Sequence, residues 1–179
     1  MDERGRRFEQ LVAPHLGAAF NFARWLTHND HDAQDIVQDA SLRALRFLDG
    51  LRGEDARPWL LGIVRNATWS WLQANRPSEL TAREDDGEPQ VPAPSSDEPE
   101  TSAIRRAEAR LLNEAITALP PPLREVIVLR ELEDLAYRQI AHIAGIPIGT
   151  VMSRLARARR LLSQSVKVIE AAADRQGAR

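Results

Sequence analysis

Apolar residues recur along most of the chain at three- and four-residue spacing, the period of a helix with one buried face. This pattern covers residues 8–26, 32–48, 57–76, 102–119 and 123–132, and it returns between residues 134 and 169. Alternation of apolar and polar residues, which would predict strands, is nearly absent. The sequence therefore predicts an all-α protein.

Capping and helix-breaking residues indicate where these helices begin and end. Pro14 lies inside the first pattern and is expected to kink that helix or to delay its start. Asp30 or Asp32 can cap the second helix, in which Leu42 is one of the apolar positions. Pro122 can open the helix that follows the run of three prolines.

The pattern after residue 134 divides into two helical segments around Gly145 and Pro147. Glycine suits a helix end and proline a first helical turn, so a tight turn is predicted between the segments, with Asp134 as a candidate cap for the first. The second segment has an apolar face, and its opposite face carries Thr150, Ser153, Arg154, Arg157 and Arg160. This pattern is typical of a helix-turn-helix, because arginine forks match guanine edges and phosphates in a major groove. Periodicity leaves open an ordinary helical hairpin with a solvated arginine face.

Charge is segregated along the chain. The net charge is −2, but residues 78–101 hold eight acidic residues and one arginine, which leaves +5 on the rest of the chain. The acidic stretch contains several prolines and no apolar period, so residues 77–101 are predicted to be a flexible linker. It separates two small helical domains, over residues 1–76 and 102–179.

Composition argues against several other classes of protein. The sequence has no apolar run long enough to span a membrane and no signal peptide at its start, so a cytoplasmic location is expected. The absence of cysteine excludes disulfides and thiolate sites. His28 and His31 form a metal-like pair without further suitable ligands, and no nucleophile elbow, phosphate loop or dinucleotide fingerprint is present. No catalytic residue, metal or cofactor is therefore predicted.

Residues 32–40, which read DAQDIVQDA, resemble the D-A-E-D-L-V-Q-E signature of bacterial extracytoplasmic-function (ECF) sigma factors. In that family this helix docks on the clamp helices of the largest catalytic subunit of RNA polymerase. The resemblance implies Asp35, Gln38 and Asp39 as docking residues that complement basic groups on the polymerase.

Residues 59–66, which read WLLGIVRN, resemble the W-L-x-x-I-A-x-N segment with which the same family recognises and melts the minus-ten promoter element. The resemblance implies Arg65, Asn66 and Trp69 as contacts to that element, because an amide reads base edges and an aromatic ring stacks on an unpaired base. A local hydrogen bond on the helix is the alternative role for Asn66. Trp69 is expected to be the exposed tryptophan, whereas Trp59 and Trp71 are expected in the core.

The helix-turn-helix carries a third resemblance. Tyr137-x-x-Ile140-Ala141, followed by GTVMSRLARAR at residues 149–159, is similar to the last conserved region of ECF sigma factors, which reads the minus-thirty-five element. The resemblance implies contacts to bases or phosphates from four residues and contacts to phosphates from two more. The first set is Thr150, Ser153, Arg154 and Arg157, and the second is Arg159 and Arg160.

These resemblances fall in two regions, about residues 8–76 and 111–166, and their order and spacing identify the chain as a member of the ECF sigma-factor family. The implied partners are core RNA polymerase, promoter DNA and an anti-sigma factor, and the chemistry of RNA synthesis belongs to the polymerase. One alternative is a stand-alone helix-turn-helix repressor that binds a palindromic operator as a dimer. Another is an enzyme on a helical scaffold, against which the lack of a catalytic constellation argues.

Overall fold

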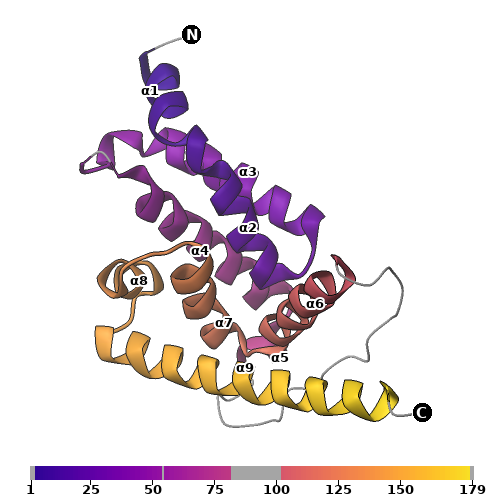
Figure 1. The fold of residues 1–179 in the computed structure, drawn as a ribbon. Helices are drawn as coiled ribbons and strands as arrows, with labels where there is room; N and C mark the ends of the chain where they lie inside the picture. The colour runs from indigo at the N-terminus through magenta and orange to yellow at the C-terminus, as the bar shows by residue number, and fades with distance from the viewer. Residues whose placement is uncertain (1–2, 54, 82–101, 178–179) are drawn as a thin grey trace.

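The computed structural model describes residues 3–53, 55–81 and 102–177, and within these ranges every regular element is a helix (Figure 1). The first half contains α1 (Glu3–Leu11), η1 (Ala13–His15), α2 (Leu16–Thr27), α3 (Asp30–Arg46), η2 (Leu48–Gly50), α4 (Ala56–Asn75) and α5 (Pro77–Thr81). The second half contains α6 (Ser102–Ala118), α7 (Pro121–Ile127), η3 (Val128–Leu132), α8 (Tyr137–Ala144) and α9 (Ile148–Gly177). The predicted fold class is confirmed. Most of the predicted linker, residues 82–101, lies outside the described residues.

Helices α2, α3 and α4 pack against one another and form the first half of the core. The predicted first helix is interrupted at Pro14, which lies in the 3₁₀ turn η1, so α1 and α2 are separate helices. Neither Asp30 nor Asp32 caps α3. Instead the side-chain oxygen of Asn29 accepts hydrogen bonds from the backbone N–H groups of His31, at 2.8 Å, and Asp32, at 3.1 Å.

The second half contains the predicted helix-turn-helix, formed by α8 and α9 around Gly145. Gly145 has φ 66°, a left-handed conformation that favours glycine at a helix end. Asp134 does not cap α8. The cap position is Ala136, whose N–H donates 2.9 Å to the side-chain oxygen of Gln139. The helix after the prolines begins at Pro121 rather than Leu123, and it continues into the π-helical turn η3.

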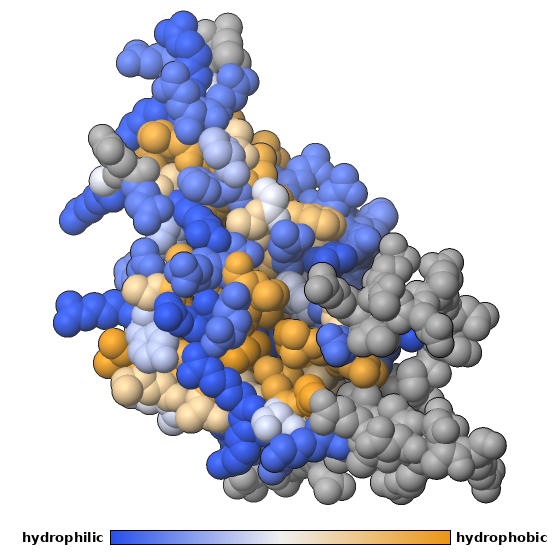
Figure 2. Space-filling model, viewed as in Figure 1, coloured by the Kyte–Doolittle hydropathy of each residue, from blue (hydrophilic) through white to orange (hydrophobic). Residues whose placement is uncertain are grey.

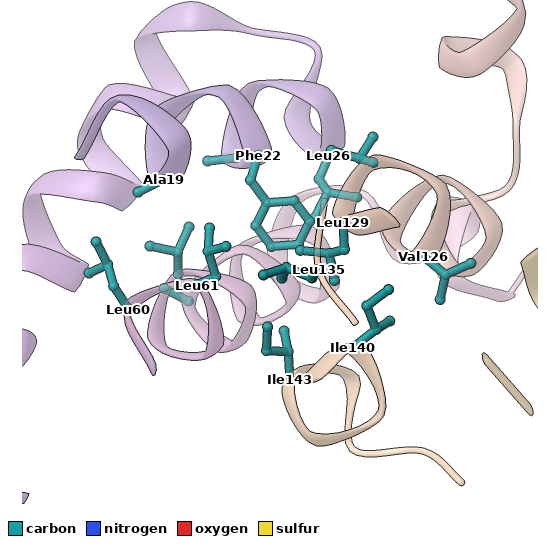
Figure 3. Close-up of a cluster of buried hydrophobic side chains, with 14 of the residues drawn as sticks. Ala19, Phe22, Leu26, Leu60, Leu61, Val126, Leu129, Leu135, Ile140 and Ile143 are labelled. Carbon is teal, nitrogen blue, oxygen red and sulfur yellow. The ribbon is translucent and has the colours of Figure 1, made fainter. Parts of the chain in front are cut away.

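The two halves share one continuous core, which the sequence did not predict. Helix α4 packs against α8, and α2 packs against α7. Figure 3 shows Phe22 and Leu26 from α2 and Leu61 from α4 in one cluster with the side chains of Leu129, Leu135, Ile140 and Ile143. Burial of apolar surface therefore stabilises the contact between the halves as well as each half.

Polar groups cross the same boundary. Arg124 of α7 is only 4% exposed, and its guanidinium donates to the carbonyl oxygens of Leu26, at 3.3 Å, and Leu119, at 2.7 Å. These carbonyls lie at the ends of α2 and α6, where intrahelical partners are lacking. Burial lowers the pKa of Arg124 to about 10, so the group stays charged at neutral pH. A second link is the ion pair between Arg57 and Glu133, at 2.5 Å.

Candidate polymerase and nucleic-acid interfaces

The exposed side of α3 contains the three predicted docking residues. Asp35, Gln38 and Asp39 are all exposed, and their spacing places them on one side of the helix. Asp35 lies 3.3 Å from the ring nitrogen of His31, and Asp39 forms an ion pair with Arg43 at 2.7 Å. This side of α3 is therefore acidic and open to a partner.

One exposed apolar side chain extends this surface, and a second lies at the end of the same helix. Leu42 is 62% exposed and Phe47 is 60% exposed. Leu42 is one of the apolar positions of the predicted helix, but it lies outside the core, because Ala40 and Ala44 fill the core side of this part of α3. Leu42 follows Asp35 and Gln38 by seven and four residues, so it continues the docking side of α3. Exposed large apolar residues beside charged ones are typical of an interaction surface.

Arg65 and Trp69 of α4 point toward α7 rather than into solvent. They lie one helical turn apart, and both donate hydrogen bonds to the same carboxylate oxygen of Glu125. The distances are 2.6 Å from the Arg65 guanidinium and 2.8 Å from the Trp69 indole nitrogen. The guanidinium carbon also lies 4.7 Å from the centre of the Trp69 ring, a cation–π arrangement. Trp69 is therefore half-buried between the two halves and is not the freely exposed tryptophan that we expected.

Glu125 is the buried acid at the centre of this contact, with a side chain that is 0% exposed. Burial raises its pKa, and the hydrogen bonds from Arg65 and Trp69 and the charge of Arg154 oppose that effect. Arg154 belongs to the predicted DNA-binding side of α9. One carboxylate thus brings together candidate DNA-binding residues from both halves of the chain.

Asn66 lies beside this pair on α4 but faces solvent. The helical turn of 100° between adjacent residues directs its side chain away from α7. Trp59 and Trp71 are partly buried, and the Arg76 guanidinium lies 5.4 Å from the centre of the Trp71 ring. Of the three predicted minus-ten residues, Asn66 is therefore the accessible one in this arrangement.

The six predicted minus-thirty-five residues all lie on α9, in its first four turns. Ser153 and Arg160 are exposed, and Thr150, Arg154 and Arg157 are partly exposed. Arg159 is directed differently from the others. It pairs with Glu131 of η3 through two hydrogen bonds to one oxygen, at 3.1 and 2.6 Å.

A groove of about 430 Å³ lies between α6, η3 and α9, close to the pair of Arg159 and Glu131. Its apolar lining is Leu112, Ile116, Ile127, Val128, Leu132 and Leu162. Figure 2 shows apolar surface gathered on the same face, above the long helix α9.

Within the described ranges, no cluster of three or more histidine or acidic residues could hold a metal ion. No helix in those ranges is both long and apolar enough to cross a membrane.

The residues that sequence reasoning missed are those that join the two halves: Arg57, Arg124, Glu125 and Glu133. Their partners are distant in sequence, and Glu125 follows Arg65 by 60 positions. A weak signal existed in the segment 123–129, where Glu125 occurs among apolar residues on a helix that has little room for a charge.

Two models of sigma-factor regions match the chain. The model of sigma-70 region 2 matches residues 11–77, and the model of sigma-70 region 4 matches residues 109–162. The RNA polymerase sigma-H factor of Pseudomonas aeruginosa is 30% identical over 90% of this chain and 87% of its own length. The ECF RNA polymerase sigma-E factor of Escherichia coli is 36% identical over 76% of this chain and 74% of its own length. The chain therefore belongs to the sigma-70 family and, within it, to the ECF sigma factors.

Solved structures agree with this assignment. The sigma factor RpoE of Bartonella quintana, in complex with the anti-sigma factor NepR, superposes with a TM-score of 0.67 at 27% identity. That match covers 90% of this chain and 97% of RpoE. CnrH, in complex with the cytosolic domain of CnrY, gives a TM-score of 0.64 at 26% identity and covers 92% of this chain and 90% of CnrH. These matches give no support to the repressor alternative.

Proposed function

We propose that this ECF sigma factor binds core RNA polymerase and directs it to specific promoters, as an initiation factor and not as an enzyme. The observation that carries the proposal is the presence of both sigma-70 regions in one chain, each with an exposed surface of suitable chemistry. Bond formation in RNA belongs to the polymerase. We also infer that the protein works in the cytoplasm, because its proposed partners are there.

Docking on the polymerase is assigned to Asp35, Gln38 and Asp39, with Leu42 as an additional apolar contact. The exposed acids and Leu42 lie on neighbouring turns of α3. Complementary charge speeds association and fixes orientation, and burial of apolar area supplies affinity. This combination suits a basic surface with an apolar centre.

Promoter reading is divided between the two halves. Arg65, Asn66 and Trp69 are assigned to the minus-ten element, where base stacking and amide contacts hold unpaired bases. Thr150, Ser153, Arg154 and Arg157 are assigned to bases or phosphates of the minus-thirty-five element, with Arg159 and Arg160 on phosphates. The exposure of Ser153 and Arg160 and the partial exposure of the others on α9 support this assignment.

We also propose that an anti-sigma factor regulates this protein. The support is the similarity to two sigma factors whose structures were solved with a regulatory partner bound.

Run-off transcription on a genomic promoter library, with core polymerase in the presence and absence of this protein, tests the proposed function. We expect discrete transcripts only when the protein is present, and their start sites would reveal both promoter elements. A protein that captures a palindromic duplex without polymerase, and gives no transcripts, would contradict the proposal and favour a repressor.

A further inference from the structure

Met152 of α9 is an apolar residue that the core does not use. Its side chain is 54% exposed, whereas the neighbouring Val151 and the nearby Leu155 are fully or almost fully buried. Ile148, four residues before Met152, is 43% exposed and lies on the same side of the helix. The start of α9 therefore presents two large apolar side chains to solvent, next to residues that the proposed function assigns to DNA.

The position of Met152 in the helix-turn-helix matters for DNA binding. The second helix of this motif enters the major groove, and its N-terminal residues lie at the base edges. Met152 is the fifth residue of α9 and directly precedes Ser153, which is exposed and assigned to bases or phosphates. The methionine side chain therefore belongs to the part of α9 that would meet base edges.

The polar residues next to Met152 already have intramolecular partners. The hydroxyl of Ser153 donates 3.1 Å to the carbonyl oxygen of Thr150. The charge of Arg154 acts on the buried carboxyl group of Glu125. Both side chains can exchange such partners for acceptors on DNA. Met152 differs from them, because a thioether has no hydrogen to donate and can distinguish bases only through apolar contact.

Thymine is the base that apolar contact favours. In the major groove every base pair presents polar donors or acceptors, and thymine adds a methyl group at C5. Polar atoms that meet an apolar side chain lose water without gaining a hydrogen bond, whereas a methyl group gains from the same contact. Methionine is suited to this contact, because its unbranched, polarizable side chain adapts to an irregular surface.

We propose that Met152 is a specificity-determining residue whose side chain packs on the C5 methyl group of a thymine in the minus-thirty-five element. The inference rests on the proposed function, and it adds to that function a base preference that the hydroxyl and arginine side chains do not supply. The base pair that Met152 reads is then A·T, with the thymine on either strand.

Uracil provides the test, because it lacks the methyl group of thymine and keeps the same hydrogen-bonding groups. Run-off transcription first maps a promoter, and each thymine of its minus-thirty-five element is then replaced by uracil in turn on both strands. The affinity of the holoenzyme, core polymerase with the full chain, is measured for each duplex at one salt concentration. We expect one replacement to weaken binding by wild type about fourfold, the amount that burial of one methyl group contributes.

The Met152→Ala holoenzyme should bind the thymine duplex about as weakly as wild type binds the uracil duplex. It should show no further loss with uracil, because the two changes remove the same contact. Replacement of the identified thymine by cytosine provides a second readout. Methylation of that cytosine at C5 should restore part of the affinity for wild type and none for Met152→Ala.

Two further variants control for other effects of the substitution. Met152→Leu keeps an apolar side chain and should keep the preference for thymine over uracil. Leu132→Ala removes another exposed apolar side chain, 48% exposed, from η3 rather than from α9. Its ratio of affinities for thymine and uracil should equal that of wild type. Circular dichroism would verify that all variants retain their helix content.

The outcomes separate this inference from the proposed function. Sensitivity to uracil at one position in wild type, lost in Met152→Ala, would support the contact. Equal ratios in the two proteins, as for a methionine that serves a protein partner instead, would overturn it while sigma activity stands. Insensitivity at every thymine, or a minus-thirty-five element without an A·T pair, would overturn it in the same way. If wild type directs no transcription, the proposed function and this inference are overturned together.

Discussion

At the scale of single residues, neighbours on one helix have separate environments. Arg65 and Trp69 of α4 are engaged by Glu125, whereas Asn66 between them faces solvent. The difference arises from the helical period, which directs residues four apart to the same side and adjacent residues to different sides. Asn66 is therefore the residue at which a role in DNA binding can be tested without disturbing the contact between the halves.

Asn66→Ala should impair promoter opening while leaving affinity for core polymerase unchanged. Loss of one amide contact to a base is expected to cost about 1–3 kcal/mol in the open complex. Reactivity of unpaired thymines within the polymerase–promoter complex measures opening. Asn75→Ala, at an exposed position near the end of the same helix, is the control. Lower thermal stability or weaker polymerase binding would show that Asn66 has a structural role.

His28 predicts a pH dependence of stability. Desolvation lowers its pKa to about 4, and the positive charges of Arg124 and Arg76 act in the same direction. Because the ordinary value is 6.5, the unfolded chain takes up a proton first as the pH falls. The stabilising contribution is thus complete above pH 6.5 and is lost progressively down to about pH 4.

Thermal unfolding at a series of pH values tests this prediction against His28→Asn. Asparagine does not titrate and tolerates the left-handed conformation of this position, where φ is 56°. Wild type should lose stability more steeply than the variant between about pH 6.5 and 4. Parallel curves would mean that His28 does not contribute to acid sensitivity.

At the scale of helices, caps and exposed surfaces decide how each element begins and what it can bind. Helix α3 has a side-chain cap from Asn29, whereas the cap position of α8 is Ala136, which cannot accept a hydrogen bond through its side chain. Helix α3 also presents apolar side chains that its core does not use. Both features lead to predictions about these helices.

Ala136→Ser should stabilise the protein by about 0.5–1 kcal/mol. The backbone of Ala136 is already extended, with φ −68° and ψ 151°, and Gln139 already accepts its N–H. A serine hydroxyl would complete the reciprocal capping box by accepting from the backbone N–H of Gln139. Chemical denaturation would measure the gain, with Ala156→Ser on the exposed side of α9 as a control that adds no cap. Equal effects of the two substitutions would contradict the capping explanation.

Leu42→Ser should weaken binding to core polymerase by roughly 1–3 kcal/mol, the amount expected when a leucine side chain loses its burial in an interface. Stability should change by less than about 0.5 kcal/mol, because Leu42 is 62% exposed in the free protein. Affinity for core polymerase without DNA is the measurement. Ile148→Ser, which removes an exposed apolar side chain from the first turn of α9, is the control. Similar affinities of wild type and Leu42→Ser would remove Leu42 from the docking surface.

At the scale of the whole molecule, the two halves are joined by one apolar core and by polar links that cross it. Arg124 has a structural part in this arrangement, because its single guanidinium satisfies carbonyl oxygens at the ends of α2 and α6. Such a core is expected to unfold cooperatively, since neither half buries its facing apolar side chains alone.

Arg124→Ala should destabilise the protein by about 2–4 kcal/mol, because it leaves buried carbonyls unsatisfied and a cavity between the halves. Thermal unfolding should show a lower and broader transition as the halves lose their mutual support. Arg138→Ala, at an exposed position on α8, should change stability little. A sharp transition at the wild-type temperature would show that Arg124 is dispensable for the contact.

Local patterns were sufficient to predict most of the helices. The break at Pro14, the helix end at Gly145 and the apolar side of the helix-turn-helix follow from backbone restriction and the helical period, which depend only on nearby residues. The errors were also local. Asn29 was overlooked in favour of nearby aspartates, and the apolar pattern did not separate the exposed Leu42 from the buried positions of α3.

The sequence by itself determined the class of this protein, because helical period, charge segregation and two ordered family motifs are properties of the linear chain. Only the tertiary structure decided that the halves pack together and that Glu125 occupies Arg65 and Trp69. A contact across 60 residues depends on how helices pack and on which charge can be buried with a partner. The spacing of residues along one helix predicts neither the packing of distant helices nor the partner of a buried charge.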